Sequence, residues 1–356
     1  MKTKSLPNQN PSTVCPACGK GSRYIYETEF PRMPGMYECP ECGLCHVNPM
    51  PSDRDLDDIY GNSYTNSFEM SERNRLLSRD YYAKFHKFLP IGRVFQFLEI
   101  GGCYGWLSDL VRKNNTAEVT MLEPGREAAR ICAERFGFDT AHGYIETWRP
   151  QKRFDVIFGG HVLEHLRDLD VFLEACNKLV VKGGLVIMLT PNASSWKYKR
   201  HGKNWGWAGT CLHTIFVTRK AVELFAGRNA FKIVSMKGKI PGWRHYPVGF
   251  TGRLSRWFRC IFPKKITSSP VTTLDASKSN ANLEKQNDHK ASFNENLRIL
   301  GRPILFTEFF VSALLDRVIG LNRADELLIV LTKTGEIGQA NHLDLISGSV
   351  ANQSPP

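Results

Sequence analysis

The chain has 356 residues, a formal net charge of +12 at pH 7 and 42% apolar residues. This length accommodates one large α/β domain with a small accessory module, and the apolar fraction is typical of a protein that buries a core. No run approaches the about 18 uninterrupted apolar residues of a membrane-spanning helix, and the first residues lack the apolar segment of a secretory signal, so we expect a cytoplasmic protein. The basic excess allows nucleic acid, an anionic membrane surface or a phosphorylated acceptor as partner, and it does not choose among them.

Three segments are predicted before the main domain. Residues 1–13 are polar and contain proline, and we expect them to be disordered. Residues 14–50 hold paired cysteines and are predicted to form a small zinc ribbon. Residues 51–90 are predicted to be a helical linker, with helices over 52–61 and 71–89.

Two Cys-x-x-Cys-Gly turns stand in the N-terminal segment, and they contribute Cys15, Cys18, Cys39 and Cys42. Each such turn presents two thiolates to one metal ion, and two turns complete the four-cysteine shell of a structural zinc site. Because a closed shell leaves no position for a substrate, we predict that the zinc stabilises the fold and takes no part in catalysis. Cys45 and His46 follow closely and are alternative ligands.

From residue 94 onward, short apolar runs alternate with amphipathic helices. Such alternation indicates βαβ units and a parallel sheet covered by helices on both faces. The predicted strands cover residues 94–100, 118–122, a short strand near 140, 154–158, 185–189, 231–236 and 326–332. The predicted helices cover residues 106–113, 125–136, 169–181, 219–226 and 306–319, and Gly183-Gly184 is expected to end the third of them.

The domain boundaries follow from these elements. We expect the α/β core at residues 91–245 together with 324–334. Residues 246–323 would form an insertion with a flexible loop over 267–296, which is rich in Ser, Thr, Asn and Lys. Residues 335–356 are expected to be a disordered tail.

A glycine-rich turn, Glu-Ile-Gly-Gly-Cys-Tyr-Gly, follows the first strand of the core. Glycine lets the backbone approach a bound cofactor closely, and the helix that opens next supplies unpaired N–H groups. A carboxylate at the end of a buried strand is costly unless it has a function, and one at the tip of the next strand binds ribose hydroxyls in dinucleotide folds. The candidate cofactor-binding residues are therefore Glu99, Gly101, Gly102, Gly105 and Glu123.

The spacing favours S-adenosylmethionine over a dinucleotide. The nicotinamide fingerprint G-x-G-x-x-G has glycine at its third and sixth places, whereas this chain has Cys103 and Trp106 there. Glu99, two residues before the first glycine, has no role against a pyrophosphate, which is an anion. It suits the cationic methionine part of a methyl donor.

The run from residue 97 to about 231 resembles the class I S-adenosylmethionine-dependent methyltransferases. The family's acid and glycines, its acid after the second strand, and its FDVI, LEHL, GG, PN and H…FT motifs occur here in the same order. The matching residues are Glu99 to Gly101, Glu123-Pro124, Phe154 to Ile157, Val162 to Leu166, Gly183-Gly184, Thr190 to Asn192 and His213 to Thr218. The resemblance implies S-adenosylmethionine as cofactor and an α/β fold with a Rossmann-like, doubly wound, seven-stranded sheet, to which the cysteine turns add a small N-terminal zinc ribbon.

Two departures from the family pattern concern the cofactor site. Cys103 stands where the family has its middle glycine, and Tyr144 follows Gly143 where an acid is frequent. Glu146 is the alternative partner for the adenine amino group.

Three histidines are candidate catalytic residues. His161 and His165 follow the strand at 154–158, where donor and acceptor meet in the family, and His161 is also a candidate for lining the cofactor site. His213 lies in a segment that covers the active site in the family. Methyl transfer needs a general base only where the acceptor is a hydroxyl or a carbon acid, so packing roles stay open for all three.

We expect methyl transfer to oxygen or carbon of a small-molecule or glycan acceptor, including lipid- or nucleotide-linked ones. Trp196, Trp205 and Trp207 lie among basic residues, where they would stack on a sugar or base or pack as a lid on the core. The ribbon and the positive charge leave an RNA methyltransferase open, and the departures noted above leave a degenerate, non-catalytic binding module open. A basic, aromatic segment at 250–265 would suit peripheral membrane contact.

Overall fold

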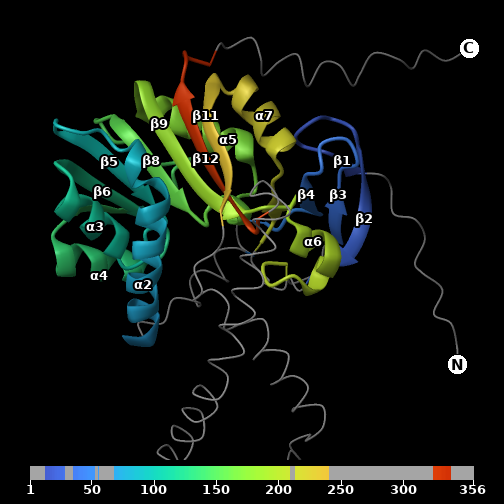
Figure 1. Ribbon diagram of the computed structural model, residues 1–356, viewed down its shortest axis with the longest axis horizontal. Coiled ribbons are helices and arrows are strands. Elements are labelled where there is room, and N and C mark those ends of the chain that lie inside the picture. The colour runs from blue at the N-terminus through green and yellow to red at the C-terminus, as the bar shows by residue number, and fades with distance from the viewer. Residues whose placement is uncertain are drawn as a thin grey trace, which may run out of the picture. The chain divides into compact units, whose positions relative to one another are not determined.

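The computed structural model contains two β-sheets, one of which is flanked by helices (Figure 1). The structure describes residues 13–28, 35–52, 55, 68–208, 213–239 and 324–337. The predicted insertion at 246–323, most of the helix predicted at 52–61 and nearly all of the predicted tail lie outside these ranges. Within them, no helix is both long and apolar enough to cross a membrane.

The larger sheet has seven strands in the order β11-β12-β9-β8-β5-β6-β7. The strands are β5 (Phe95–Ile100), β6 (Ala117–Glu123), β7 (Asp139–His142), β8 (Phe154–Gly160), β9 (Val180–Pro191), β11 (Phe231–Lys239) and β12 (Glu326–Lys333). β12 runs antiparallel to both of its neighbours, and the other pairings are parallel. Because β5 lies between β6 and β8, the chain winds away from β5 in both directions, and in sheets of this kind ligands bind beyond the carboxyl ends of the strands at such a point.

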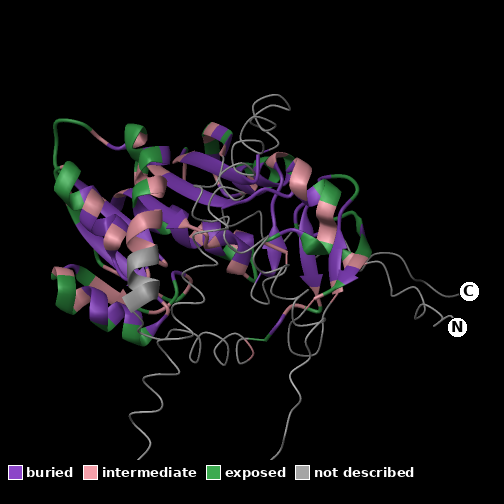
Figure 2. Cartoon of the chain, turned by 60° about the horizontal axis from the view of Figure 1, so that its bottom comes forward, coloured by how far each residue is buried: buried purple, intermediate pink, exposed green. Residues whose placement is uncertain are grey.

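Helices cover both faces of this sheet. They are α2 (Phe68–Phe85), α3 (Trp106–Asn114) and α4 (Arg126–Phe136) on one face, and α5 (Leu169–Leu179) and α7 (Arg219–Arg228) on the other. Successive strand residues point to opposite faces, so Phe97 packs in one apolar cluster with Phe85, while Leu98 packs in a second cluster with Phe225. Figure 2 shows the strands buried between these layers. The doubly wound fold predicted from the sequence is confirmed.

The smaller sheet is antiparallel and has the order β1-β2-β3-β4-β10. Its strands are β1 (Thr13–Val14), β2 (Gly21–Glu27), β3 (Gly35–Glu38), β4 (Cys45–Asn48) and β10 (Ile215–Phe216). β10 lies about 170 residues after β4 in the sequence, between β9 and β11 of the larger sheet, so the α/β domain supplies the last strand of the smaller sheet. Its apolar residues, such as Met36 and Val47, share a cluster with Tyr198 of α6 (Trp196–His201) and with Phe216.

The predicted elements that fall within the described residues agree with the structure except at the junction of α5 and β9 and at the end of the linker helix. The helix ends at Leu179, and the strand begins at Val180, which pairs with Phe154. The prediction that Gly183-Gly184 ends the helix was wrong, because β-branched Val180 and Val181 favour extended backbone and start the strand earlier. The linker helix also stops earlier than predicted, at Phe85, and a 3-10 turn, η1 (His86–Phe88), completes it.

Candidate functional site

The turn after β5 requires glycine at the predicted positions. Gly101 and Gly105 have positive φ angles, 67° and 75°, which favour glycine. A Cβ at Gly102 would lie 2.7 Å from Sδ of Met121, and a Cβ at Gly105 would lie 2.5 Å from Sγ of Cys132. The backbone of the turn therefore packs directly on β6 and α4, with no room for a side chain between them.

Cys103 stands where the family has glycine, and it adopts the backbone conformation that glycine favours. Its φ is 53°, in the left-handed region that costs a residue with a Cβ about 1–2 kcal/mol. The family pattern and the backbone thus agree on the shape of the turn, and this chain keeps that shape with a strained residue. Such strain is typical of functional sites.

Glu99, the penultimate residue of β5, has a buried carboxylate beside this turn. Only 5% of the residue is exposed, and Oε2 accepts a 2.6 Å hydrogen bond from Oγ of Ser108 in α3. Burial raises the pKa of Glu99 to about 7, and the hydrogen bonds from Ser108 offset this only in part. A cation next to this carboxylate would favour its charged form.

Glu123 ends β6 and is wholly buried against the same turn. Oε2 accepts a hydrogen bond from the backbone N–H of Cys103 at 2.8 Å, and Oε1 accepts one from Gly125 at 2.8 Å. Burial raises its pKa to about 7 despite these two donors. The structure therefore brings both strand-end acids to one turn, and neither of them points into solvent.

Glu146 lies in the segment that follows β7 and is half-buried, and burial raises its pKa. The segment is tied to the tip of β6, because the N–H of Gly143 donates to the carbonyl of Glu123 at 3.1 Å. Tyr144, which replaces the family's frequent acid, is 41% exposed. Glu146 thus lies three residues after a residue that is bonded to the tip of β6.

His161 follows β8 and lies between two buried carboxylates. Its Nδ1 is 2.9 Å from Oε1 of Glu164, and its Nε2 is 3.2 Å from Oε1 of Glu326. Burial disfavours the imidazolium, but the two carboxylates outweigh burial and raise the pKa of His161 above its usual range. The imidazole ring stacks on the indole ring of Trp207, with ring centroids 4.7 Å apart. The backbone of His161 has a positive φ of 57°. A cationic ring on an indole face is a favourable cation–π arrangement.

Two further charged residues of this cluster, Glu326 and Lys84, were not predicted from the sequence. Glu326 begins β12 and is fully buried, and its Oε2 accepts a 2.6 Å hydrogen bond from Nζ of Lys84 in α2, which also pairs with Asp80. The signal that identified Glu99, a carboxylate at the end of a buried strand, applies equally to Glu326. Lys84 carries no such signal, since a lysine in an amphipathic helix is ordinarily exposed.

His213 lies close to this cluster, in the chain just before β10. Its Nδ1 is 2.6 Å from the carbonyl oxygen of Trp207, which can only accept, so Nδ1 carries the proton. Burial lowers the pKa of His213 to about 4, and the neighbouring ring of His165 adds to this effect. His213 is therefore neutral at pH 7, with the lone pair on Nε2.

His165 and His213 meet next to the Glu164 carboxylate. Their ring centroids are 4.8 Å apart, and His165 ends the turn η2 (Leu163–His165). The ligand atoms of the three residues lie within 4.8 Å of one another. Both oxygens of Glu164 already accept hydrogen bonds, one from His161 and the other from Thr190, so we interpret Glu164 as the partner of the His161 ring rather than as a metal ligand.

Of the three tryptophans singled out in the sequence, only Trp207 adjoins a candidate catalytic residue in a described ring stack. Trp205 is buried, its Nε1 donates to Oδ1 of Asp325, and its ring packs on Tyr198 and Phe216. Of the two roles left open for Trp205, the structure therefore agrees with the second, a ring packed on the core.

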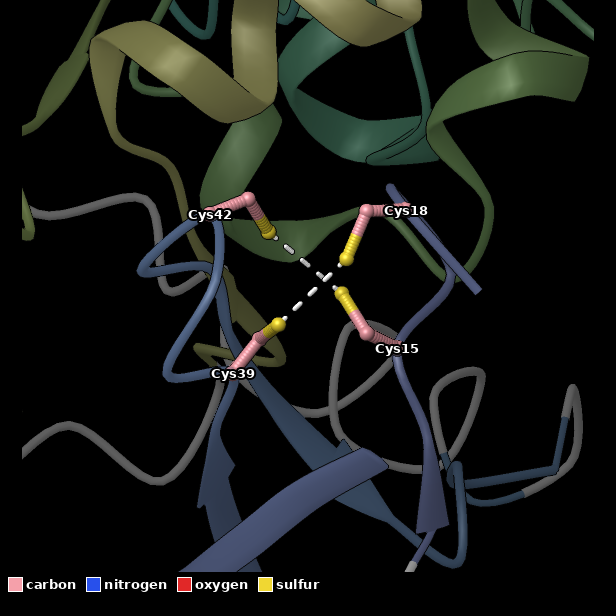
Figure 3. A group of neighbouring side chains, drawn as sticks. All are labelled: Cys15, Cys18, Cys39 and Cys42. Atoms are coloured by element: carbon pink, nitrogen blue, oxygen red, sulfur yellow. Dashed lines mark hydrogen bonds between the residues drawn. The ribbon is translucent and has the colours of Figure 1, made fainter. Parts of the chain in front are cut away.

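The four predicted zinc ligands converge from two turns (Figure 3). Their sulfur atoms lie 3.5 Å apart for Cys15 and Cys42 and 3.4 Å apart for Cys18 and Cys39. These separations are far longer than a disulfide bond and close to the about 3.8 Å that follows for four thiolates at about 2.3 Å from a tetrahedral zinc. The arrangement fits a zinc ribbon. Cys45 is directed elsewhere, with its Sγ 3.2 Å from the hydroxyl of Tyr198.

Comparisons with known proteins agree with the domain type. Residues 71–236 match a family model described as a methyltransferase domain. The ubiquinone biosynthesis O-methyltransferase of Bradyrhizobium sp. (strain ORS 278) is 33% identical over 86 residues, which are 23% of this chain and 34% of that protein. The protein of the same name from Rhodopseudomonas palustris (strain BisB18) is 36% identical over 86 residues, again 23% of this chain and 34% of that protein. The chain thus spans about a third of the length of these curated relatives.

Solved structures give weaker likenesses. An S-adenosylmethionine-dependent methyltransferase from Mesorhizobium loti has a TM-score of 0.43 and 13% identity, covering 71% of this chain and 97% of that one. One from Archaeoglobus fulgidus has a TM-score of 0.44 and 15% identity, covering 76% of this chain and 100% of that one.

Proposed function

We propose that this chain, whose residues 71–236 match a methyltransferase domain, is a class I enzyme that transfers the methyl group of S-adenosylmethionine to a small-molecule acceptor. The observation that carries the proposal is the pair of buried carboxylates, Glu99 and Glu123, held against one glycine-rich turn. When bound, the cofactor supplies a methyl group already activated by a sulfonium. The protein therefore has to bind, align and exclude water more than it has to activate the donor.

The two acids suit two different parts of this cofactor. Among the described residues, Ser108 donates a side-chain hydrogen bond to Glu99, and the buried charge of Glu99 would be further stabilised by the cationic methionine moiety. Glu123 is oriented by the N–H groups of Cys103 and Gly125, and a carboxylate at this strand tip is placed to accept hydrogen bonds from ribose hydroxyls. Glu146, near the same strand tip, is our proposed partner for the adenine amino group.

On the acceptor side, we assign the proton-accepting role to His213. Its hydrogen bond to the carbonyl of Trp207 leaves Nε2 as the basic atom, and a neutral imidazole can take a proton from a hydroxyl as the methyl group is transferred. His161 suits a different role, because two carboxylates hold it in its cationic form. We propose that this cation fixes the two carboxylates, since both of its ring nitrogens face them. His165, whose ring contacts that of His213, would align that ring.

A hydroxyl oxygen is our proposed acceptor atom. The curated relatives are named for O-methylation in ubiquinone biosynthesis, and an oxygen acceptor needs the general base that His213 can supply. A sugar hydroxyl and a hydroxyl on an aromatic ring both satisfy this chemistry. A nitrogen acceptor would give no reason for burying a neutral histidine beside the site.

We also propose that the four-cysteine site holds one structural zinc ion. All four thiol groups lie in one cluster, and three of the residues are buried, so a substrate has no open position there. The ion would tie together two turns that are 20 residues apart in sequence.

Isothermal titration of the full chain with S-adenosylhomocysteine tests the proposed function. We expect one site per chain with micromolar affinity that both Glu99→Ala and Glu123→Ala weaken. Glu127→Ala is a matched control, since Glu127 lies at the surface of α4 and pairs with Arg130. A wild-type chain that is folded by circular dichroism and binds no S-adenosylhomocysteine would refute the proposal. If the wild-type chain binds S-adenosylhomocysteine, methyl transfer from radiolabelled S-adenosylmethionine to pooled phenols and sugars would identify the acceptor.

A further inference from the structure

The four-cysteine ribbon and the proposed acceptor site are joined by one short strand. β10 pairs with the ribbon strand β4, with Ile215 opposite His46 and Phe216 opposite Cys45. One residue earlier, the N–H of Val47 donates to the carbonyl of Thr214 at 2.9 Å. The residue before Thr214 is His213, so the edge strand of the ribbon sheet leads directly to the proposed base.

Thr214 is hydrogen-bonded on its other side to the turn that carries Glu164. Its N–H donates to the carbonyl of Glu164 at 2.7 Å, and its hydroxyl contacts the carbonyls of Glu164 and Leu166. The residue is completely buried. Thr214 therefore lies between the ribbon and the η2 turn and is bonded to both, through Val47 on one side and Glu164 on the other.

The cysteine turns are themselves attached to the helix that follows β10. Thr218 caps α7 by accepting from the N–H of Ala221, and its hydroxyl donates to the carbonyl of Cys42. A Cβ at Gly43 would lie 2.9 Å from Cγ2 of Thr218, so the contact is close. At the other end of α7, Arg228 donates to the carbonyls of Pro16 and Ala17. Both cysteine turns thus present backbone carbonyls to one helix.

We propose that the metal-loaded ribbon positions the acceptor site. Thr214 is the positioning residue, because its hydrogen bonds to the ribbon and to the η2 turn fix His213 and Glu164 in place. The ribbon strand satisfies the carbonyl of Thr214, and the second cysteine turn fixes Thr218, so the segment 213–218 is held from both ends. If the cysteine turns lose their metal, β4 and the carbonyl of Cys42 lose their fixed positions. The segment 213–218 then loses the hydrogen bonds that hold it at both ends. The catalytic consequence rests on the proposed function, whereas the structural coupling does not.

Hydrogen–deuterium exchange on the full chain, read by mass spectrometry, tests this coupling. Zinc is removed with a chelator, or the ribbon is disrupted by Cys39→Ser, and peptides covering 163–166 and 213–218 are compared with peptides covering 106–123. We expect exchange in the first two to rise about tenfold, as for the loss of one net hydrogen bond, with the third unchanged. Exchange that rises only within 15–48 would overturn the proposal, and so would a uniform rise over the whole chain.

Two substitutions at Thr214 separate positioning from simple folding. Thr214→Val removes the hydroxyl that contacts Glu164 and Leu166, and Thr214→Ser keeps it. We expect the valine variant to keep bound zinc and the wild-type affinity for S-adenosylhomocysteine while exchange at 163–166 rises, and the serine variant to restore protection. Equal behaviour of the two variants would overturn the role of the hydroxyl. Because S-adenosylhomocysteine binding is measured in parallel, its absence in the wild-type chain would refute the proposed function and leave the exchange comparison to decide the coupling.

Discussion

The carboxylate of Glu123 accepts a hydrogen bond from the backbone N–H of Cys103, which joins the tip of β6 to the strained residue of the glycine-rich turn after β5. The bond orders the turn and orients the acid at the same time. It also leaves a fully buried carboxylate whose remaining lone pairs can accept from a ligand. The turn and the acid that we propose for cofactor binding are thus already ordered by each other.

The first prediction concerns this acid. Glu123→Ala should weaken S-adenosylhomocysteine binding by about 10- to 100-fold, the effect of losing hydrogen bonds to a charged group. Glu123→Gln keeps the size and one acceptor, and we expect a smaller loss. Isothermal titration measures both. Unchanged affinity in the alanine variant would contradict the assignment of Glu123 to the ribose.

The second prediction is a pH dependence. Burial raises the pKa of Glu99 and of Glu123 to about 7 in the cofactor-free chain, and a bound cation favours the ionised form. S-adenosylhomocysteine affinity should therefore rise as pH increases from about 6 to about 8, and Glu99→Gln should flatten this profile. An affinity that is independent of pH in the wild-type chain would argue against a cationic ligand group at Glu99.

The same shifts set the sign of a stability effect. The ordinary pKa of these acids is 4.5, so between pH 4.5 and about 7 the folded chain keeps protons that the unfolded chain has released. Their contribution to the stability of the cofactor-free protein is therefore lost as pH rises through this window. Thermal unfolding at several pH values, comparing wild type with the Glu99→Gln, Glu123→Gln double variant, would show a steeper fall for the wild type.

The third prediction concerns the buried charge cluster around His161. Lys84→Met should destabilise the fold by about 3–5 kcal/mol, because it leaves the fully buried Glu326 without its cationic partner in α2. Lys87→Met is the matched control, since Lys87 is exposed three residues further along the chain. Urea denaturation measures the difference in the free energy of unfolding. Equal stabilities of the two variants would show that the pair is not needed.

The fourth prediction concerns metal content. The purified chain should contain one zinc ion, measured by inductively coupled plasma mass spectrometry, and Cys42→Ser should lose it. Cys103→Ser should keep it, because Cys103 lies in the glycine-rich turn after β5 and outside the four-cysteine cluster. A second ion per chain would call for a new assignment of Glu164, His165 and His213.

The fifth prediction uses two glycines that differ in their surroundings. Gly102→Ala would place a Cβ 2.7 Å from Sδ of Met121 and 2.8 Å from Cδ of Glu99, so we expect S-adenosylhomocysteine binding to fall at least tenfold. Gly206→Ala would meet open space, and we expect wild-type affinity. If the first substitution were tolerated as well as the second, the close packing of the turn would have no role in binding.

The sequence by itself determined the order of strands and helices, because the alternation of apolar runs with amphipathic helices reports directly which residues are buried. It also determined the two strand-end acids and the paired cysteines, because each is a short local pattern with a chemical requirement behind it. The boundary at Val180 was misjudged, since a local glycine signal competed with β-branched residues whose preference was satisfied by pairing with β8.

Only the tertiary structure decided the roles of the histidines and the place of the ribbon. The charge of His161 depends on Glu326, which is 165 positions away in sequence and comes into contact through the pairing of β12 with β9. The tautomer of His213 depends on the backbone carbonyl of Trp207. Every residue has such a carbonyl, so the sequence does not show which one accepts the hydrogen bond. The attachment of the ribbon through β10 and Thr214 is made by backbone hydrogen bonds between residues more than 160 positions apart, and such long-range pairing is set by packing rather than by any local pattern.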